Sequence, residues 1–430
     1  MMKNSQIFSD YNKTTLENGL RILTSTIKHT NAVSINFFLG AGSRYESDSL
    51  AGASHLFEHV LFKGTKNKPT SREISTVVEG VGGIINAFTD REMTGYWCHM
   101  PYPNYRSGID LISDMIRNSL FREKDIENEK HVIYEEIRSA SDSPSGKAGL
   151  TLDSVLWPNQ AMGRGIAGTT KSVENISKNE MLQYLNTQYV ASNLIISVAG
   201  NITHENIVDQ ITQTMSDFRD GEIQQMIPFE DNLSGPVVSF EKRDTEQTTI
   251  CLGMHALPYN HPKRDALSLL SIILGETMSS RLFEEVREKR ALAYDIHSSC
   301  HFFSDCGVFQ VECGIDPSKL YDALPVIISE ISRLRDGVTD EECSGAKKLA
   351  IGRLLLRMED SRSIANFIGV QELLKNKVDS LRTVIDRLET VTTNNITSVA
   401  NDVIKSQKLA VSIVGPQCNE SKVLSFLDFT

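Results

Sequence analysis

The chain has 430 residues, of which 40% are hydrophobic, and a formal net charge of −11 at pH 7. This length exceeds one ordinary domain and allows a large buried core, so two or more domains are expected. The acidic balance argues against nucleic acid as the main partner and mildly favours basic peptides, although a surplus of surface carboxylates more often serves solubility.

The cysteines and the N-terminal sequence indicate a reducing compartment. Seven cysteines are an odd number, and their positions match no metal-ligand spacing, so reduced thiols are favoured over a disulfide framework. Cys306 and Cys313, the closest pair, are interpreted as core filling. Residues 1–20 contain charged side chains and no apolar run, which predicts no secretory signal, and no run of about 18 apolar residues predicts a membrane span. We therefore expect a cytoplasmic protein.

The first predicted elements are extended segments at residues 20–39 and a buried helix at residues 50–63. The centre of this helix reads His55-Leu56-Phe57-Glu58-His59. Residues four apart on a helix lie almost above one another, so His55 and His59 can reach one metal ion, with Glu58 beside them. A buried helix does not carry three polar groups without partners, which favours a metal site. The alternative is a histidine pair that is satisfied without a metal.

A short helix and a strand follow. Thr70-Ser71-Arg72-Glu73 is typical of a capping box and opens a helix that should stop near Gly80 and Gly82. A phosphate-cradling loop at Gly82 and Gly83 is disfavoured because no Lys or helix start comes next.

Residues 84–89 are predicted to form a strand with an exposed edge. Such an edge could pair with an extended peptide through main-chain hydrogen bonds. Asn86 would then point at the substrate backbone; alternatively, its side chain bonds to its own loop.

A second helix that matters for a metal is predicted at residues 123–140. Its apolar stripe consists of Ile126, Ile133, Ile137 and Ala140. At about 100° per residue, Glu129 and Glu136 fall inside this stripe, whereas Glu135 points to the opposite side. A catalytic zinc needs a third protein ligand, so Glu136 is the better ligand and Glu135 a solvent residue. The alternative is that Glu129 and Glu136 merely pair with a Lys or Arg.

The two halves of the chain echo one another, which predicts an internal repeat. Each half contains extended segments, a helix, a strand pair, further helical periodicity and a closing apolar strand; the second copies lie at residues 237–254, 264–274, 293–314 and 408–415. We predict a metal-binding domain at residues 1–218, a linker rich in Gly and Pro at residues 219–236, and a homologous domain without metal at residues 237–430. The fold class is α+β, with two homologous α/β domains, each a mixed or antiparallel sheet covered by helices.

The repeat also indicates where metal chemistry is absent. If Gly275 is aligned with Gly64, the positions of the two histidines and the glutamate of the first half are occupied by Ala266, Leu269 and Leu270. Residues 346–351 are apolar and basic where the first half has its glutamate helix. One chain should therefore hold one metal, and the second half should be a structural and substrate-contacting partner.

With these residues, the sequence resembles the pitrilysin or insulinase family of inverzincin metallopeptidases, in its short bacterial branch similar to the mitochondrial processing peptidase. The resemblance covers nearly the whole chain. It implies that His55, His59 and Glu136 bind Zn²⁺, that Glu58 is the general base, and that Glu129 is a supporting carboxylate.

Two further segments resemble substrate-binding parts of this family. Residues 82–89 resemble the strand that binds substrate, which implies contacts from Gly83, Asn86, Ala87 and Phe88. Residues 287–294 resemble the segment whose arginine and tyrosine approach the substrate, which implies roles for Arg287 and Tyr294. From spacing alone, Arg287 would be a helix-surface residue paired with Glu284, and Tyr294 an ordinary strand aromatic.

The resemblance implies a zinc endopeptidase that cuts unfolded peptides or targeting segments. The alternatives are a non-catalytic scaffold or presequence-binding subunit related to the processing peptidases, and a structural zinc protein; the complete ligand set and the open coordination position disfavour them. Larger family members enclose substrate between two halves, each about the length of this chain. The resemblance therefore also implies a homodimer with composite active sites, in which Arg287 and Tyr294 face the metal site of the other subunit.

Overall fold

The computed structural model describes residues 11–429, so the stretch that was interpreted as lacking a secretory signal lies partly outside it. The chain divides into two compact units, each built from three segments. Unit 1 combines the described part of Met1–Ile137 with Gly165–Ile227 and Leu354–Thr383; unit 2 combines Arg138–Arg164, Pro228–Arg353 and the described part of Val384–Thr430.

Unit 1 contains a six-stranded sheet with the order β1-β2-β6-β3-β5-β4. Its strands are β1 (Tyr11–Thr15), β2 (Arg21–Thr26), β3 (Ala32–Leu39), β4 (Ile84–Thr89), β5 (Thr94–Pro101) and β6 (Leu194–Gly200). The pair β2–β6 is parallel and the other pairs are antiparallel, so the sheet is mixed, as predicted. The strand β4, which carries the predicted substrate-binding residues, lies at one edge.

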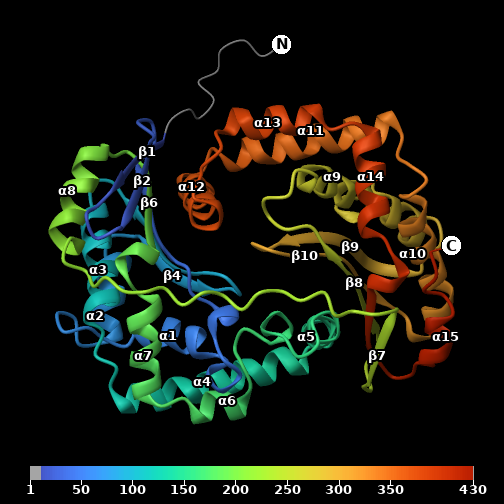
Figure 1. The fold of residues 1–430 in the computed structure, drawn as a ribbon, viewed down its shortest axis with the longest axis horizontal. Coiled ribbons are helices and arrows are strands. Elements are labelled where there is room, and N and C mark those ends of the chain that lie inside the picture. Colours follow the sequence, from blue (N-terminus) through green and yellow to red (C-terminus); the bar gives the residue numbers. More distant parts are fainter. Residues whose placement is uncertain (1–10, 430) are drawn as a thin grey trace. The chain divides into compact units, whose positions relative to one another are not determined.

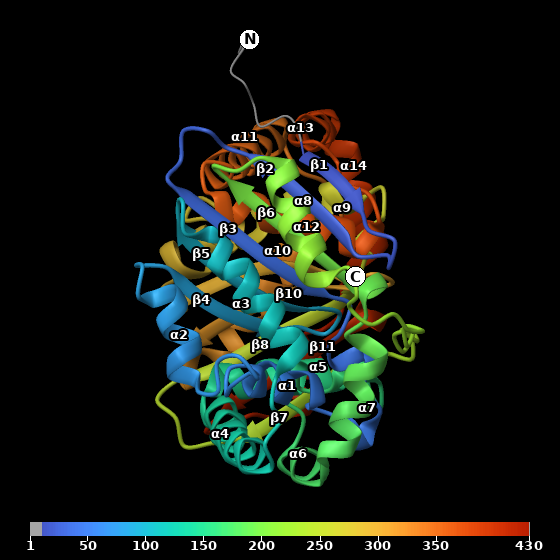
Figure 2. The same ribbon diagram turned by 90° about the vertical axis from the view of Figure 1, so that its left-hand side faces the viewer.

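Helices cover both faces of this sheet. The helices with residues in unit 1 include α1 (Ala53–Leu61), α2 (Ser71–Glu79), α3 (Tyr105–Asn118), α4 (Glu123–Asp142), α6 (Thr170–Asn175), α7 (Lys178–Gln188), α8 (His204–Met215) and α12 (Ser361–Lys375). Successive side chains of a strand point to opposite faces. Accordingly, Phe37 of β3 packs in the core that includes α3, and its neighbour Phe38 packs in a separate cluster with Ile368 of α12. Figure 2 shows α3 in front of β3 and β5, and Figure 1 shows α12 beside β2 and β6.

Unit 2 repeats the topology with a five-stranded sheet of order β7-β11-β8-β10-β9. Its strands are β7 (Val237–Lys242), β8 (Thr248–Ala256), β9 (Ala293–Phe302), β10 (Gly307–Ile315) and β11 (Leu409–Gly415). This order matches β2-β6-β3-β5-β4 strand for strand, and β7 and β11 form the parallel pair that corresponds to β2 and β6. The predicted internal repeat and fold class are confirmed; β1 is an additional edge strand in the first copy.

One helix in each unit comes from the other half of the sequence. The helices with residues in unit 2 include α5 (Pro144–Leu156), α9 (Arg264–Gly275), α10 (Leu320–Arg333), α11 (Asp340–Arg357), α13 (Leu381–Thr390), α14 (Thr393–Val403) and α15 (Glu420–Leu424). Leu152 and Leu156 of α5 pack against Gly253 of β8, just as α12 packs on β3. The boundaries at residues 1–218, 219–236 and 237–430 therefore describe the sequence repeat, and their use as domain limits stays a prediction.

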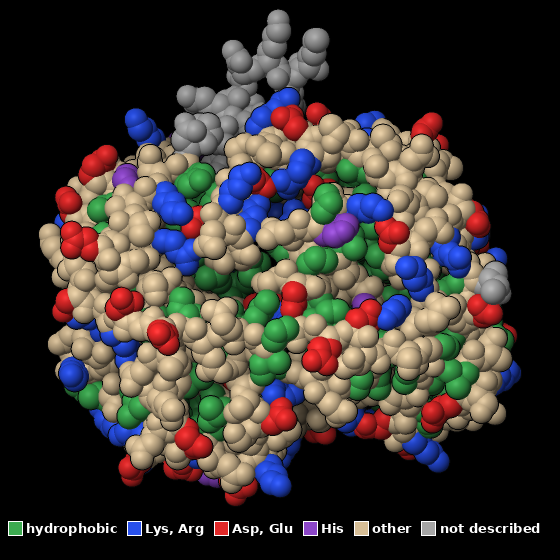
Figure 3. Space-filling view, in the orientation of Figure 1, with side chains coloured by type: hydrophobic (Ala, Val, Ile, Leu, Met, Phe, Trp, Pro, Cys, Tyr) green, Lys and Arg blue, Asp and Glu red, His purple; other side chains and the backbone are tan. Residues whose placement is uncertain are grey.

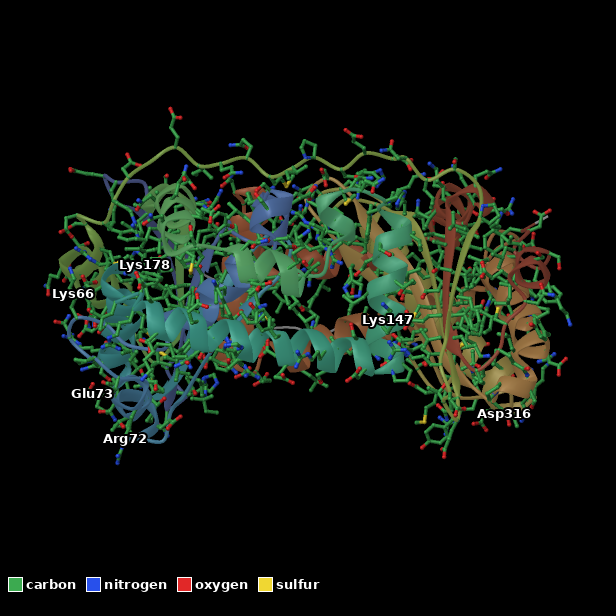
Figure 4. All side chains as sticks on the ribbon, turned by 90° about the horizontal axis from the view of Figure 1, so that it is seen from below. Lys66, Arg72, Glu73, Lys147, Lys178 and Asp316 are labelled. Atoms are coloured by element: carbon green, nitrogen blue, oxygen red, sulfur yellow. The ribbon has the colours of Figure 1, made fainter. Side chains whose placement is uncertain are left out.

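The capping box predicted before β4 is present. The Thr70 hydroxyl accepts a hydrogen bond from the Glu73 backbone N–H at 3.3 Å, and the Thr70 N–H donates to Glu73 Oε2 at 2.9 Å. Figure 4 labels Arg72 and Glu73 in this first turn of α2. The helix ends at Gly80, and Gly82 has a φ of 81°, which favours glycine. Termination of a helix, rather than a phosphate loop, explains these glycines.

Cysteines and surface charges agree with the sequence-based expectations. All seven cysteines are free thiols, and Cys306 and Cys313 are buried as core residues. On the face in Figure 3, acidic and basic side chains are interspersed. Among residues 11–429, no helix has the length and apolar character needed to cross a membrane.

Candidate metal centre

The helix α1 is fixed at its N-terminus by glycine geometry and by a buried carboxylate. Gly52 adopts a φ of 96° just before the helix, so α1 begins at Ala53, later than the predicted residue 50. Glu46 accepts hydrogen bonds from the backbone N–H groups of Gly52 and Ser54 at 2.8 and 2.7 Å, which satisfies donors that have no partner within the helix. The buried side of α1 includes Leu56, Phe57, Val60 and Leu61. The metal-ligand candidates therefore sit on a rigid element.

Three donor atoms converge between α1 and α4. Nε2 of His55 and Nε2 of His59 lie 3.5 and 3.6 Å from Oε2 of Glu136. Each residue of the trio offers one ligand atom within 4.8 Å of the others. Zinc ligands at about 2.0–2.1 Å in a tetrahedral arrangement stand roughly 3.3 Å apart, so this spacing and the two-nitrogen, one-oxygen donor set fit Zn²⁺.

The two histidines differ in their surroundings. Burial, and to a smaller extent the neighbouring His59, lowers the pKa of His55 to about 4, which favours the neutral imidazole that binds metals. Nδ1 of His55 is buried and has no hydrogen-bond partner among the described residues. Nδ1 of His59, in contrast, lies 3.1 Å from Oε2 of Glu129. A hydrogen bond there leaves Nε2 of His59 as the nitrogen that is available to a metal.

Glu129 is held from two sides. Its Oε1 lies 2.7 Å from Nζ of Lys63, and its residue is only 5% exposed. Glu129 therefore pairs with a basic residue, which was the alternative, and also contacts His59. The sequence-based interpretation did not identify Lys63, although its position four residues after His59, just past the end of α1, was available as a signal.

The predicted phase of α4 is only partly right. Ile126, Glu129 and Ile133 are buried, but Ala140, which was expected to continue the apolar stripe, is exposed. The side chain of Glu136 is 46% exposed, yet its carboxylate reaches both histidines. Glu135 is exposed and lies outside the trio.

Glu58 lies beside the trio and accepts one strong hydrogen bond. The Thr89 hydroxyl donates to Oε2 of Glu58 at 2.6 Å. Burial raises the pKa of Glu58, and the Thr89 hydrogen bond opposes this shift. A carboxylate with a raised pKa is suited to accept a proton and later to return it. Thr89 was not identified as a site residue from the sequence.

The predicted substrate strand β4 has mixed surroundings. Ile84 is 56% exposed, and the side chain of Asn86 accepts a hydrogen bond from the Ala87 N–H at 2.8 Å, which is the local bonding that was left open. A side chain at Gly83 would come within 2.9 Å of the His99 carbonyl oxygen, so only glycine fits there. Phe88 packs near Phe38, with ring centroids 6.4 Å apart.

Arg287 and Tyr294 lie together in unit 2. The Arg287 guanidinium stands over the rings of Phe283 and Tyr294, at 4.6 and 5.1 Å from their centroids. Glu284 pairs with Lys289 at 2.8 Å, and the carboxylate nearest to the Arg287 Nε is that of Glu288, at 3.8 Å. Arg287 and Tyr294 line a cavity of about 570 Å³, and Tyr294 is 76% exposed. The pair is therefore accessible to a ligand.

The helix α9 corresponds to α1 and carries apolar residues at the positions of His55, Glu58 and His59. Ala266, Leu269 and Leu270 of α9 are 3%, 0% and 0% exposed. Within residues 11–429, the trio on α1 and α4 is the only group of three metal-binding side chains with this spacing. One metal per chain stays a prediction.

Comparisons with known proteins place this chain in a family. The profile described as "Insulinase (Peptidase family M16)" matches residues 21–170, and "Peptidase M16 inactive domain" matches residues 175–349. A protein described as an uncharacterized zinc protease of Streptomyces coelicolor is 33% identical over 94% of this chain and 89% of its own length. The uncharacterized zinc protease YmxG of Bacillus subtilis is 31% identical over 94% of this chain and 98% of its own length.

Solved structures show the same fold. A protease from Helicobacter pylori superposes with a TM-score of 0.89 at 21% identity, over 95% of this chain and all of that chain. The class is that of two-domain metallopeptidases. The chain belongs to peptidase family M16, the insulinase or pitrilysin family, and the predicted cofactor Zn²⁺ is confirmed by the zinc proteases among its relatives.

Proposed function

We propose that this protein is a zinc-dependent endopeptidase that hydrolyses unfolded peptides or targeting segments. The observation that carries the proposal is the convergence of His55, His59 and Glu136, whose donor atoms lie 3.5 and 3.6 Å apart across α1 and α4. Glu58 lies on α1 between the two histidines, within reach of a substrate that approaches these ligands.

The metal ligands, Glu58 and Glu129 have different roles in the proposed mechanism. His55, His59 and Glu136 would hold Zn²⁺, which would supply Lewis acidity toward a peptide carbonyl and water. Glu58 accepts the proton of the attacking water and returns it to the amine that leaves. Glu129 keeps the proton of His59 on Nδ1 and so orients the ring.

The substrate would bind as an additional strand. Only β5 pairs with β4 among the described strands, so the free side of β4 offers main-chain groups to an extended peptide. Gly83, Asn86, Ala87 and Phe88 would form this contact. Arg287 and Tyr294 would donate hydrogen bonds to the developing oxyanion or to the substrate backbone.

The test combines a peptide-library digest with metal analysis of the same preparation. Wild-type protein should cut peptides, lose activity with a chelator and regain it with Zn²⁺. Glu58→Gln should retain zinc and lose turnover by roughly three orders of magnitude or more, because it removes proton transfer without removing a ligand. Residual activity within about tenfold of wild type would contradict the role of Glu58.

The second candidate is a non-catalytic scaffold or presequence-binding subunit. It is supported by the description of the profile that matches residues 175–349, "Peptidase M16 inactive domain". The complete trio and Glu58 in the first half favour the enzyme. Peptide binding without hydrolysis in zinc-loaded protein would favour the scaffold.

The expected assembly is a cytoplasmic homodimer with composite active sites, which rests on the family resemblance. In a mixture of Glu58→Gln and Arg287→Ala subunits, each heterodimer would contain one wholly wild-type site. Random two-fold pairing then predicts about a quarter of full activity. If the subunits demonstrably exchange and the mixture stays inactive, the composite site is wrong.

A further inference from the structure

The hydrogen bond between Thr89 and Glu58 connects the proposed substrate-binding strand with the proposed general base. Glu58 belongs to the helix α1, and Thr89 is the last residue of the edge strand β4. The oxygen–oxygen distance of 2.6 Å is typical of a hydroxyl that donates to a charged carboxylate, the stronger class of hydrogen bond.

The strand geometry aims Thr89 at Glu58. Ile85 and Ala87 pack against the core that contains α1, and Thr89 continues the same alternation. The hairpin after Thr89 is closed by a hydrogen bond from the Asp90 N–H to the Met93 carbonyl oxygen at 2.8 Å. Threonine is branched at Cβ and has few χ1 rotamers, so its hydroxyl is held in place. The donor is therefore rigid.

A hydroxyl that is fixed on Oε2 of Glu58 also restricts the orientation of Oε1. A glutamate side chain has three rotatable bonds, and the Thr89 hydroxyl restrains the carboxylate through Oε2. Oε1 is then left to accept the proton of the attacking water and to return it to the leaving amine.

From this geometry we infer that Thr89 is a positioning residue, which aligns the Glu58 carboxylate with a peptide that is bound along β4. The inference rests on the proposed function and deepens it. Because the strand that would pair with the substrate also holds the base, substrate register and base orientation are set by one element. Thr89 should therefore affect turnover more than substrate affinity.

The experiment compares Thr89→Val, which keeps the branched shape without the hydroxyl, with Thr89→Ser, which keeps the hydroxyl. Thr26→Val, at an exposed position of β2, is the matched control for a Thr-to-Val change in a strand. Each variant is made in the wild-type and in the Glu58→Gln background. The measurements are kcat, KM and zinc content.

Thr89→Val should lower kcat roughly tenfold to a hundredfold, with KM within about twofold and zinc retained, because a hydrogen bond to a charged group is lost. Thr89→Ser and Thr26→Val should stay within about threefold of wild type. In the Glu58→Gln background the effect of Thr89→Val should vanish, since the group that it positions is absent.

Three results would overturn the inference. The first is an unchanged kcat in Thr89→Val, and the second is a rise in KM alone. The third is a loss of zinc with the loss of activity, which would indicate a structural role. An active wild-type enzyme with an unaffected Thr89→Val variant leaves the proposed function standing, whereas a zinc-loaded wild-type protein that hydrolyses no peptide overturns both.

Discussion

The helices α1 and α9 occupy corresponding places in the two copies of the repeat but differ in chemistry. On α9, Leu269 and Leu270 are fully buried, and each such side chain stabilises the fold by about 1.5–3 kcal/mol. On α1, the corresponding positions hold Glu58 and His59, which need polar partners. The comparison shows that one helix position carries buried apolar side chains in the second copy and candidate metal ligands in the first.

The largest expected effect separates two adjacent glutamates of α4. Glu136→Gln should release zinc and abolish hydrolysis, because its Oε2 is the atom that faces both histidines. Glu135→Gln should leave zinc content unchanged. Elemental analysis of both variants after dialysis makes the comparison. Equal metal loss in the two would show that the trio is assigned wrongly.

The second prediction tests the apolar copy. Leu269→Ala should lower the free energy of unfolding by about 2–5 kcal/mol, because it opens a cavity in a fully buried part of α9. Zinc content of the folded variant should stay the same. Urea denaturation and metal analysis provide both values. Loss of zinc without loss of stability would contradict the assignment of metal binding to α1 and apolar packing to α9.

A smaller effect is expected from Lys63, which holds Glu129 behind His59. Lys63→Met should weaken zinc binding roughly tenfold to a hundredfold, a usual effect of losing an outer partner of a ligand. Lys63→Arg should retain most of the affinity. Lys66→Met, on an exposed lysine, is the control. Competition with a chelator of known affinity measures the difference, and equal affinities for Lys63→Met and Lys66→Met would exclude this role.

The smallest effect concerns buried thiols in both copies. Burial raises the pKa of Cys98 in unit 1 and, together with smaller contributions from Glu312 and Asp295, raises that of Cys313 in unit 2 to about 12. Since the folded pKa exceeds the unfolded value, each thiol contributes stability that is complete below the unfolded pKa, about 8.5–9, and is lost as the pH rises toward the folded value. The free energy of unfolding, measured by urea denaturation, should therefore fall between pH 8 and 9.5 by roughly 1 kcal/mol per buried thiol. In Cys313→Ala this fall should be smaller; an identical fall would contradict it.

Much of the fold follows from sequence because the signals are local. The capping box before α2, the apolar strands β6 and β11 and the repeat of strand order depend on short patterns that the structure confirms. The positions of α5 and α12 could not be predicted in this way. Each packs on a sheet formed by the other half of the sequence, and no local pattern encodes a partner that is so distant along the chain.

The same limit applies to the candidate site. Spacing on one helix indicated His55, Glu58 and His59, and helix phase indicated Glu136. The supporting contacts from Lys63 and Thr89 depend on how α4 and β4 meet α1 in space. Identification of such contacts requires tertiary structure, because a lysine and a threonine at these positions have many ordinary roles.

The central claim is that the first copy of the repeat holds one zinc ion and the second copy holds none. Anomalous diffraction from crystals of the wild-type protein at the zinc absorption edge tests it most directly. The account predicts one peak per chain, about 2.0–2.2 Å from Nε2 of His55, Nε2 of His59 and a carboxylate oxygen of Glu136. A peak at α9, or crystals grown with Zn²⁺ that show no peak between α1 and α4, would contradict it.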